Sequence, residues 1–143
     1  MKTTLALRIA AVITLLFCIG HMLGMPWVGS LNASQMAQIE AVKSIRAETM
    51  GFVRSYWDFH IGFGLIIAVN FLAQSVLFWQ LATWAKSDAS RIRPIAGLFA
   101  LAYVAFILLG FVYLFWAPIV FSFAIAACLT TAWLTCKADR LLE

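Results

Sequence analysis

The sequence predicts an all-α membrane protein, a bundle of four transmembrane helices, from two observations. Hydrophobic residues make up 64% of the 143-residue chain and charged residues only 11%, whereas a soluble domain carries about 25% charged residues. The apolar residues also gather in four long stretches, at residues 5–25, 57–81, 95–115 and 119–135. Each stretch is close to the ~20 residues that a helix needs to cross a hydrocarbon core about 30 Å thick. We therefore expect one domain, 1–143, whose main solvent is lipid.

The first apolar stretch, 5–25, resembles a secretory signal peptide in its start. Lys2 precedes the stretch and Arg8 lies near its start, as in the charged region of such a peptide. However, no small-residue cleavage site follows, and the run continues as far as Gly24. We therefore expect an uncleaved first span.

The connection between the first and second spans is the long one, and it carries a helix signature. Asn32 and Gln35 have the spacing of a capping box, in which the two side chains bond each other's backbone amides. A periodic apolar run follows, formed by Met36, Ile39, Val42 and Ile45. The pattern predicts a short amphipathic helix on the extracytoplasmic side, ended by Gly51.

The second, third and fourth spans are joined by short connections. Residues 82–93 form a basic loop, and Pro94 suits the first turn of the third span, where its missing amide costs nothing. Residues 116–118, Trp-Ala-Pro, predict a tight turn, so that spans 95–115 and 119–135 form a helical hairpin.

The basic residues predict the orientation of the spans. If the N-terminus is cytoplasmic, seven basic residues lie inside and three outside; the inside set is Lys2, Arg8, Lys86, Arg91, Arg93, Lys137 and Arg140, and the outside set is Lys43, Arg46 and Arg54. Because short cytoplasmic loops are rich in Lys and Arg, both termini are expected in the cytoplasm. Tryptophans agree, with Trp27, Trp57 and Trp116 at the outer interface and Trp79, Trp84 and Trp133 at the inner one.

Several function classes are disfavoured by what the spans lack. The net charge of +4 is explained by residues at span ends, and no basic cluster interleaved with aromatics indicates nucleic-acid binding. The three cysteines show no paired spacing, and no carboxylate lies deep in a span. There is no Ser/His/Asp set and no phosphate-binding glycine loop. A non-catalytic membrane protein is favoured over an enzyme, with the lipid bilayer and a membrane-protein partner or a second copy as partners.

Two histidines lie near the outer ends of their spans and are weak metal-site candidates. His21 and His60 have matched depth, so a haem iron or another metal between them is one alternative. A second alternative is a hydrogen bond to a quinone or a lipid head group. The third is that each ring satisfies a backbone carbonyl or water. A third zinc ligand is not evident, because Asp58 lies about 160° around the helix from His60.

A charged pair lies beside the second histidine. Arg54 and Asp58 have i, i+4 spacing, which predicts an ion pair on one helix face. The leading hypothesis is a non-catalytic or accessory protein that binds a lipid-like ligand or a protein partner near the outer leaflet; its ligand-binding residues are His21, Arg54, Trp57, Asp58 and His60. One alternative is a small redox protein that holds haem or quinone near His21 and His60. The other is an oligomeric transport subunit.

Other polar and small residues in the spans are expected to be structural. Membrane hydroxyls such as that of Tyr103 mostly bond their own backbone or a neighbouring helix. The pairs Gly20/Gly24 and Gly62/Gly64 are expected to let helices pack closely.

Three segments carry a family resemblance: residues 54–65 (RSYWDFHIGFGL), 19–24 (IGHMLG) and 79–82 (WQLA). With them, the chain resembles a family of small, uncharacterised four-helix proteins of the bacterial inner membrane with a DoxX-like general architecture. The resemblance implies a bacterial inner-membrane location and a four-helix bundle. It implies no activity for particular residues.

Overall fold

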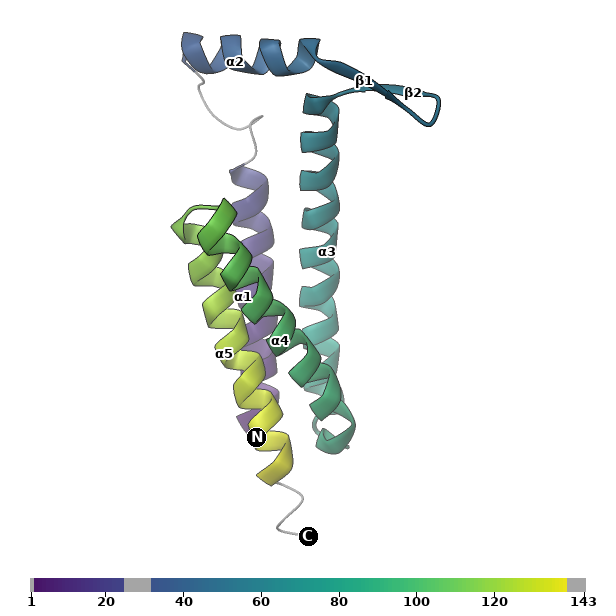
Figure 1. Ribbon diagram of the computed structural model, residues 1–143. Coiled ribbons are helices and arrows are strands. Elements are labelled where there is room, and N and C mark those ends of the chain that lie inside the picture. The colour runs from purple at the N-terminus through teal and green to yellow at the C-terminus, as the bar shows by residue number, and fades with distance from the viewer. Residues whose placement is uncertain (1, 25–31, 139–143) are drawn as a thin grey trace. The chain divides into compact units, whose positions relative to one another are not determined.

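The protein consists almost entirely of helix, and the computed structural model describes residues 2–24 and 32–138, with side chains through residue 136. Its helices are α1 (Lys2–Leu23), α2 (Ala33–Ser44), α3 (Tyr56–Trp84), α4 (Ala89–Tyr113) and α5 (Trp116–Ala138), and its strands are β1 (Arg46–Thr49) and β2 (Phe52–Ser55) (Figure 1). Helices α1, α3, α4 and α5 are each long and apolar enough to cross a membrane. The predicted fold class is confirmed. Trp27, Arg140 and the side chain of Lys137 lie outside the described residues.

The chain groups into two compact units. The bundle unit comprises Met1–Ile19 and Phe71–Glu143, and the connecting unit comprises Gly20–Asn70. Helices α1 and α3 each begin in one unit and end in the other. The prediction of one domain over 1–143 stays a prediction.

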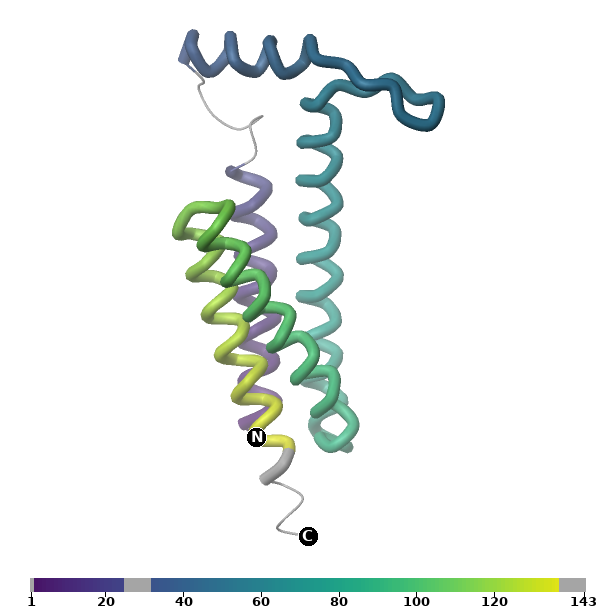
Figure 2. The backbone as a smooth tube through the Cα atoms, viewed as in Figure 1, coloured from purple at the N-terminus to yellow at the C-terminus, as the bar shows by residue number. Residues whose placement is uncertain are grey.

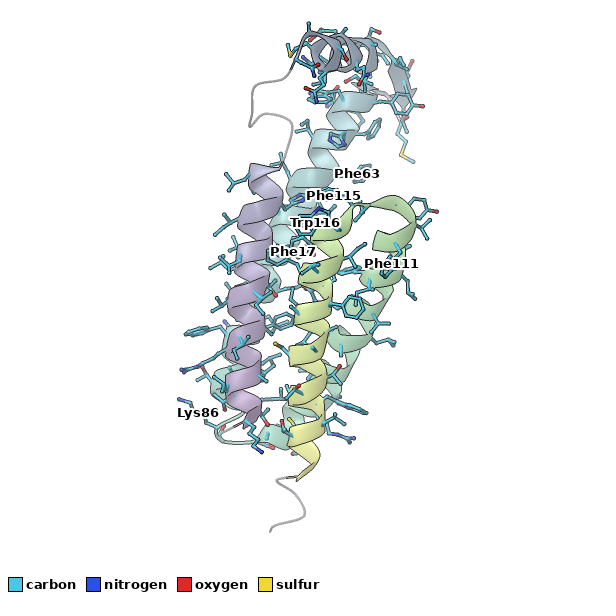
Figure 3. All side chains as sticks on the ribbon, turned by 90° about the vertical axis from the view of Figure 1, so that its left-hand side faces the viewer. Phe17, Phe63, Lys86, Phe111, Phe115 and Trp116 are labelled. Atoms are coloured by element: carbon cyan, nitrogen blue, oxygen red, sulfur yellow. The ribbon has the colours of Figure 1, made fainter. Side chains whose placement is uncertain are left out.

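The bundle unit holds parts of all four long helices, running in alternating directions (Figure 2). At one end, the Thr3 and Thr135 hydroxyls lie 2.8 Å apart and join the start of α1 to the end of α5. The Ser75 hydroxyl donates to the carbonyl of Ala11, 2.9 Å away, and joins α3 to α1. The end at which α1 and α4 begin and α3 and α5 end is called the basic end. Figure 3 shows Lys86 there, while Phe111, Phe115 and Trp116 lie at the opposite end of the unit.

The core of the bundle unit combines small residues with a few large side chains. Alanines such as Ala10, Ala96 and Ala132 are fully buried, which lets the helix backbones approach one another. Large side chains exposed by no more than 2% fill the remaining space: Leu7, Phe78, Leu81, Ile92, Tyr103, Ile125 and Leu129. Because lipid tails are as apolar as these side chains, such a core is held by close packing and interhelical hydrogen bonds.

One interhelical hydrogen bond lies inside this core. The phenol of Tyr103 on α4 donates to the Gln74 carboxamide oxygen on α3 at 2.8 Å. The Thr14 hydroxyl of α1 donates to the carbonyl oxygen of Ala10 in its own helix, 2.8 Å away. Tyr103 and Thr14 are both fully buried. The expectation that the Tyr103 hydroxyl bonds a neighbouring helix is confirmed, since it links α4 to α3.

Helices α4 and α5 form the predicted hairpin, and two glycines of α4 allow their close approach. A Cβ at Gly97 would lie 3.0 Å from Cδ1 of Trp133, and a Cβ at Gly110 would lie 2.8 Å from Cγ1 of Ile119. Gly20 and Gly62, from the pairs Gly20/Gly24 and Gly62/Gly64 that were expected to allow close helix packing, differ from Gly97 and Gly110 in the space around them. A Cβ added at Gly20 or at Gly62 would meet no atom within 4 Å, so close helix packing at these two positions was a wrong expectation.

Two helix starts differ from the predicted ones. Helix α4 begins at Ala89 rather than near residue 95, because the Asp88 carboxylate accepts from the backbone amides of Ser90 and Arg91 as an N-cap. Pro94 therefore lies inside α4, past its first turn, and its predicted place in that turn is wrong. Residues 116–118 are not a turn either, because α5 already begins at Trp116.

The connecting unit contains α2 and a two-stranded hairpin. The predicted capping box is confirmed: Asn32 accepts from the Gln35 amide at 2.8 Å, and Gln35 accepts from the Asn32 amide at 3.0 Å. The helix ends at Ser44 rather than at Gly51. Strands β1 and β2 follow as an antiparallel pair with Arg46 opposite Ser55 and Thr49 opposite Phe52.

The hairpin turn explains what Gly51 does. Met50 and Gly51 have φ of 54° and 82°. Positive φ at both central residues is the conformation of a two-residue turn that matches the twist of the flanking strands. Gly51 adopts it without steric cost, whereas Met50 is a rare non-glycine residue in this region. Gly51 therefore closes a hairpin and does not terminate α2.

Candidate functional site

The start of α3 is fixed by a reciprocal pair of hydrogen bonds. The Asp58 carboxylate accepts from the Ser55 amide at 2.8 Å, and the Ser55 hydroxyl accepts from the Asp58 amide at 3.1 Å. Ser55 is buried and immediately precedes the helix, so the two residues form a capping box. One carboxylate oxygen of Asp58 accepts the hydrogen bond from the Ser55 amide. The side chain is exposed, so its other oxygen can accept a hydrogen bond from a ligand.

The predicted ion pair between Arg54 and Asp58 is not formed. The ion pairs among the described residues are Lys43–Glu40 and Arg91–Asp88. Arg54 lies in β2, ahead of the helix, where the i, i+4 rule for helical neighbours does not apply. Its guanidinium donates to the carbonyl of Val53 at 3.0 Å and lies 5.6 Å from the ring centre of Phe52.

Arg54 and Asp58 nevertheless border the same groove. A shallow, largely open depression of about 270 Å³ lies on one face of α3; its lining residues are Arg54, Asp58, Phe59, Gly62, Phe63 and Ile66. The two charged residues lie at its beginning, and the rest of its lining is apolar. From Asp58 to Ile66 the helix rises by about 12 Å. The groove is therefore charged at one end and apolar along its length.

The apolar part of the groove is built from two aromatic rings and a glycine. Phe59 and Phe63 are stacked, with ring centres 6.3 Å apart, and are 38% and 62% exposed. Ile66 continues the wall one turn further and is also exposed. Gly62 lies between them, and no atom lies within 4 Å of the place where its Cβ would be. The absence of a side chain at Gly62 leaves the groove open.

The other two predicted site residues of α3 lie on its opposite face. At about 100° per residue, Trp57 and His60 are turned away from Asp58 by about 100° and 160°. Trp57 and His60 contact each other, with ring centres 5.7 Å apart. The Lys43 ammonium of α2 lies 5.8 Å from the centre of the Trp57 ring. The structure therefore brings Trp57 and His60 together, but not with Arg54 and Asp58.

His21 also belongs to this opposite face. Its Nε2 lies 2.9 Å from the carbonyl oxygen of Gly64, one turn after His60 on α3. A carbonyl oxygen only accepts, so Nε2 carries the proton and donates. The alternative in which His21 satisfies a backbone carbonyl is confirmed. A protonated Nε2 has no lone pair for a metal, so this contact does not favour a haem or metal held through that atom.

No metal site is visible in the part of the chain that the structure describes, where no three His, Cys, Asp or Glu residues gather. The groove residues Phe59, Phe63 and Ile66 were missed in the sequence because apolar residues are common in every span. Their signal was the i, i+4 spacing of Asp58, Gly62 and Ile66 on one face of the second span, with Phe59 and Phe63 next to that row.

No protein-family model, curated protein or solved structure matches the chain. The candidate site therefore rests on its own geometry and chemistry.

Proposed function

We propose that the protein binds a zwitterionic phospholipid with a primary ammonium head group, such as phosphatidylethanolamine, in the α3 groove. One observation carries this proposal: a cation and an anion border the charged end of a groove whose remaining lining is apolar. A zwitterionic lipid matches this arrangement, because its head group carries both charges and its hydrocarbon chain is apolar. The role is binding or accessory, not catalytic.

Each part of the lipid has a partner of matching chemistry. The Arg54 guanidinium, which has no carboxylate partner among the described residues, suits a phosphate because its planar fork donates two hydrogen bonds at once. The Asp58 carboxylate suits an ammonium that still carries N–H groups. The quaternary ammonium of phosphatidylcholine cannot donate such bonds, so we expect it to bind more weakly. The acyl chain lies along Phe59 and Phe63.

The proposed setting is the bacterial inner membrane, with both termini in the cytoplasm and the connecting unit facing outward. Support comes from the basic residues at the basic end: Lys2, Arg8, Lys86, Arg91 and Arg93. Cytoplasmic ends of spans carry such an excess of Lys and Arg. The family resemblance supports the same membrane. In this orientation the groove opens in the outer leaflet, at the depth of the head groups and upper acyl chains.

A steric block tests the proposal without changing any charge. Gly62→Leu places a side chain in the groove, and because a Cβ there meets no atom within 4 Å, the fold tolerates it. Gly20→Leu is the matched control, since Gly20 is equally open but does not line the groove. The measurement is lipid retained by protein from nanodiscs of mixed phosphatidylethanolamine, phosphatidylcholine and phosphatidylglycerol, by native mass spectrometry. We expect Gly62→Leu to lose retained phosphatidylethanolamine and Gly20→Leu to keep it.

The role of the Asp58 charge in lipid binding is tested with a variant that keeps the helix N-cap intact. Asp58→Ala removes an acceptor from the Ser55 amide, so a loss of binding in that variant would mix two effects. Asp58→Asn keeps an acceptor oxygen and removes only the negative charge. We expect Asp58→Asn to remove the preference for phosphatidylethanolamine over phosphatidylcholine. Retention that is unchanged in both Gly62→Leu and Asp58→Asn contradicts the proposal, and a protein partner becomes the better hypothesis for this face.

A further inference from the structure

Two arginines at the basic end are stacked on tryptophans of neighbouring helices. The guanidinium carbon of Arg8 on α1 lies 5.1 Å from the centre of the Trp79 ring on α3. That of Arg93 on α4 lies 5.2 Å from the centre of the Trp133 ring on α5. Each pair therefore links two helices, and the ring face stabilises the positive charge that lies over it.

The Trp133 ring of the Arg93 pair also packs against the backbone of α4 at Gly97. A Cβ at Gly97, one turn after Arg93, would lie 3.0 Å from Cδ1 of Trp133. The indole thus lies directly on the backbone of α4, in the space left by the missing side chain. The indole also contacts the guanidinium of Arg93. Such a pair presents a guanidinium in a fixed position, which lowers the entropy lost when a ligand binds.

Each of these two arginines has one guanidinium nitrogen without a hydrogen-bond acceptor among the described residues. Within the described residues, the Nε atoms of Arg8 and Arg93 are buried and have no hydrogen-bond partner. Neither arginine forms an ion pair with a described carboxylate. Arg91 is the contrast: two residues from Arg93, its Nε lies 2.9 Å from a carboxylate oxygen of Asp88. A buried donor without an acceptor costs free energy. Arg8 and Arg93 are only half-buried, so a ligand that brings acceptors can bind the exposed part of each guanidinium.

Both pairs lie close to the starts of α1 and α4. Arg8 lies six residues after the start of α1 at Lys2, and Arg93 lies four residues after the start of α4 at Ala89. These separations correspond to about 9 Å and 6 Å along the helix axes. Exposed apolar side chains flank Arg8, among them Leu5 and Ile9. An acceptor group that lies next to these apolar side chains suits the phosphate of a lipid.

We infer that the two arginine–tryptophan pairs bind phosphate groups of anionic phospholipids in the leaflet at the basic end. A phosphate supplies several acceptor oxygens and a negative charge, and it matches the planar donor fork of a guanidinium. The net positive charge of the basic end favours an anionic lipid over a zwitterionic one. This inference is independent of the groove on α3, which lies in the other unit and is proposed for a zwitterionic lipid.

The test compares arginine variants in nanodiscs that contain phosphatidylglycerol in phosphatidylcholine. Arg8→Gln and Arg93→Gln remove one charge each, and Arg91→Gln is the matched control because Arg91 already has a carboxylate partner. The measurement is phosphatidylglycerol retained by the protein in native mass spectrometry, with thermal unfolding in pure phosphatidylcholine as the check on folding. We expect at least about tenfold weaker retention in Arg93→Gln and Arg8→Gln, equivalent to about 1.4 kcal/mol. Arg91→Gln should bind as the wild type does.

Two further arms decide between explanations. Arg93→Lys keeps the charge but loses the flat, bidentate fork, so we expect intermediate retention. Inorganic phosphate at millimolar concentration is added as a competitor; retention that it does not change supports a lipid site, and displacement of the lipid by it overturns the assignment to a lipid. Equal loss in Arg91→Gln and Arg93→Gln would show a diffuse charge effect and overturn the inference. Unchanged retention in Arg8→Gln and Arg93→Gln, with the fold intact, would also overturn it.

Discussion

The hydrogen bond between Tyr103 and Gln74 provides the sharpest test of how the bundle unit is held together. Tyr103→Phe removes only the phenol oxygen and leaves the Gln74 carboxamide oxygen without its donor at 2.8 Å. Gln74→Leu removes the acceptor and leaves the buried phenol O–H of Tyr103 without it. We therefore expect each single change to destabilise the bundle unit.

The magnitude follows from burial and from the cost of an unpaired polar group. Tyr103 is fully buried, so Tyr103→Phe should lower the free energy of unfolding by about 1–2 kcal/mol, within the range for a buried group left without a partner. The double variant replaces both polar groups by apolar ones and should be less destabilised than the sum of the two. Interhelical hydrogen bonds in membranes give coupling energies of about 0.6 kcal/mol on average and about 1.7 kcal/mol at most. The short distance and full burial favour the upper half of that range.

The assay is a double-mutant cycle on reversible unfolding in mixed detergent micelles. Four proteins are compared: wild type, Tyr103→Phe, Gln74→Leu and the double variant. A coupling energy below about 0.3 kcal/mol, where independent sites are simply additive, would refute the hydrogen bond as a stabilising link between α3 and α4.

Three further predictions follow from particular contacts. Gly110→Ala should destabilise the α4–α5 hairpin by about 1–3 kcal/mol, because its Cβ would lie 2.8 Å from Ile119, and Ile119→Ala in the same chain should recover part of this loss in unfolding experiments. The Ser90 hydroxyl, which donates to Asp88, holds the pKa of that carboxyl below its usual value of 3.8. Ionised Asp88 therefore stabilises the fold above that value, and this contribution should be lost as the pH falls through the lowered pKa. In Asp88→Asn, the melting temperature should fall less steeply with decreasing pH than in the wild type. An unchanged pH dependence would contradict this role of Asp88. His21→Gln, which keeps a donor for the carbonyl oxygen of Gly64, should unfold like the wild type, whereas His21→Leu should be less stable; an equal loss of stability in both variants would contradict a stabilising role of this hydrogen bond.

The sequence alone was sufficient for the fold class because the relevant patterns are local and strong. Each span is a run of apolar residues about as long as the hydrocarbon core is thick. The capping box of Asn32 and Gln35 depends on spacing alone, and it is present as predicted. The helix boundaries were harder to predict. Pro94 suggested a helix start near residue 95, but the N-cap Asp88 begins α4 six residues before Pro94.

The candidate site was less predictable because it depends on the structure of the segment before α3, which is a strand and not a helix. The sequence predicted an ion pair between Arg54 and Asp58, which is not formed, because a helix was assumed where β2 lies. The hairpin went unnoticed because its turn is Met50–Gly51 rather than an Asn-Gly or Asp-Gly pair. The two faces of α3 could have been separated from the 3.6-residue period alone, since Asp58 and His60 point in nearly opposite directions.

The most direct measurement of the central claim is photo-crosslinking with phosphatidylethanolamine that carries a diazirine in its acyl chain. The protein is reconstituted with this lipid, irradiated and digested, and the labelled peptides are identified by mass spectrometry. We predict preferential labelling at Phe59, Phe63 and Ile66, reduced in Gly62→Leu and not in Gly20→Leu. Labelling spread evenly over the exposed apolar residues of α1, α3 and α4, and unchanged by Gly62→Leu, would contradict the claim that the groove binds a lipid.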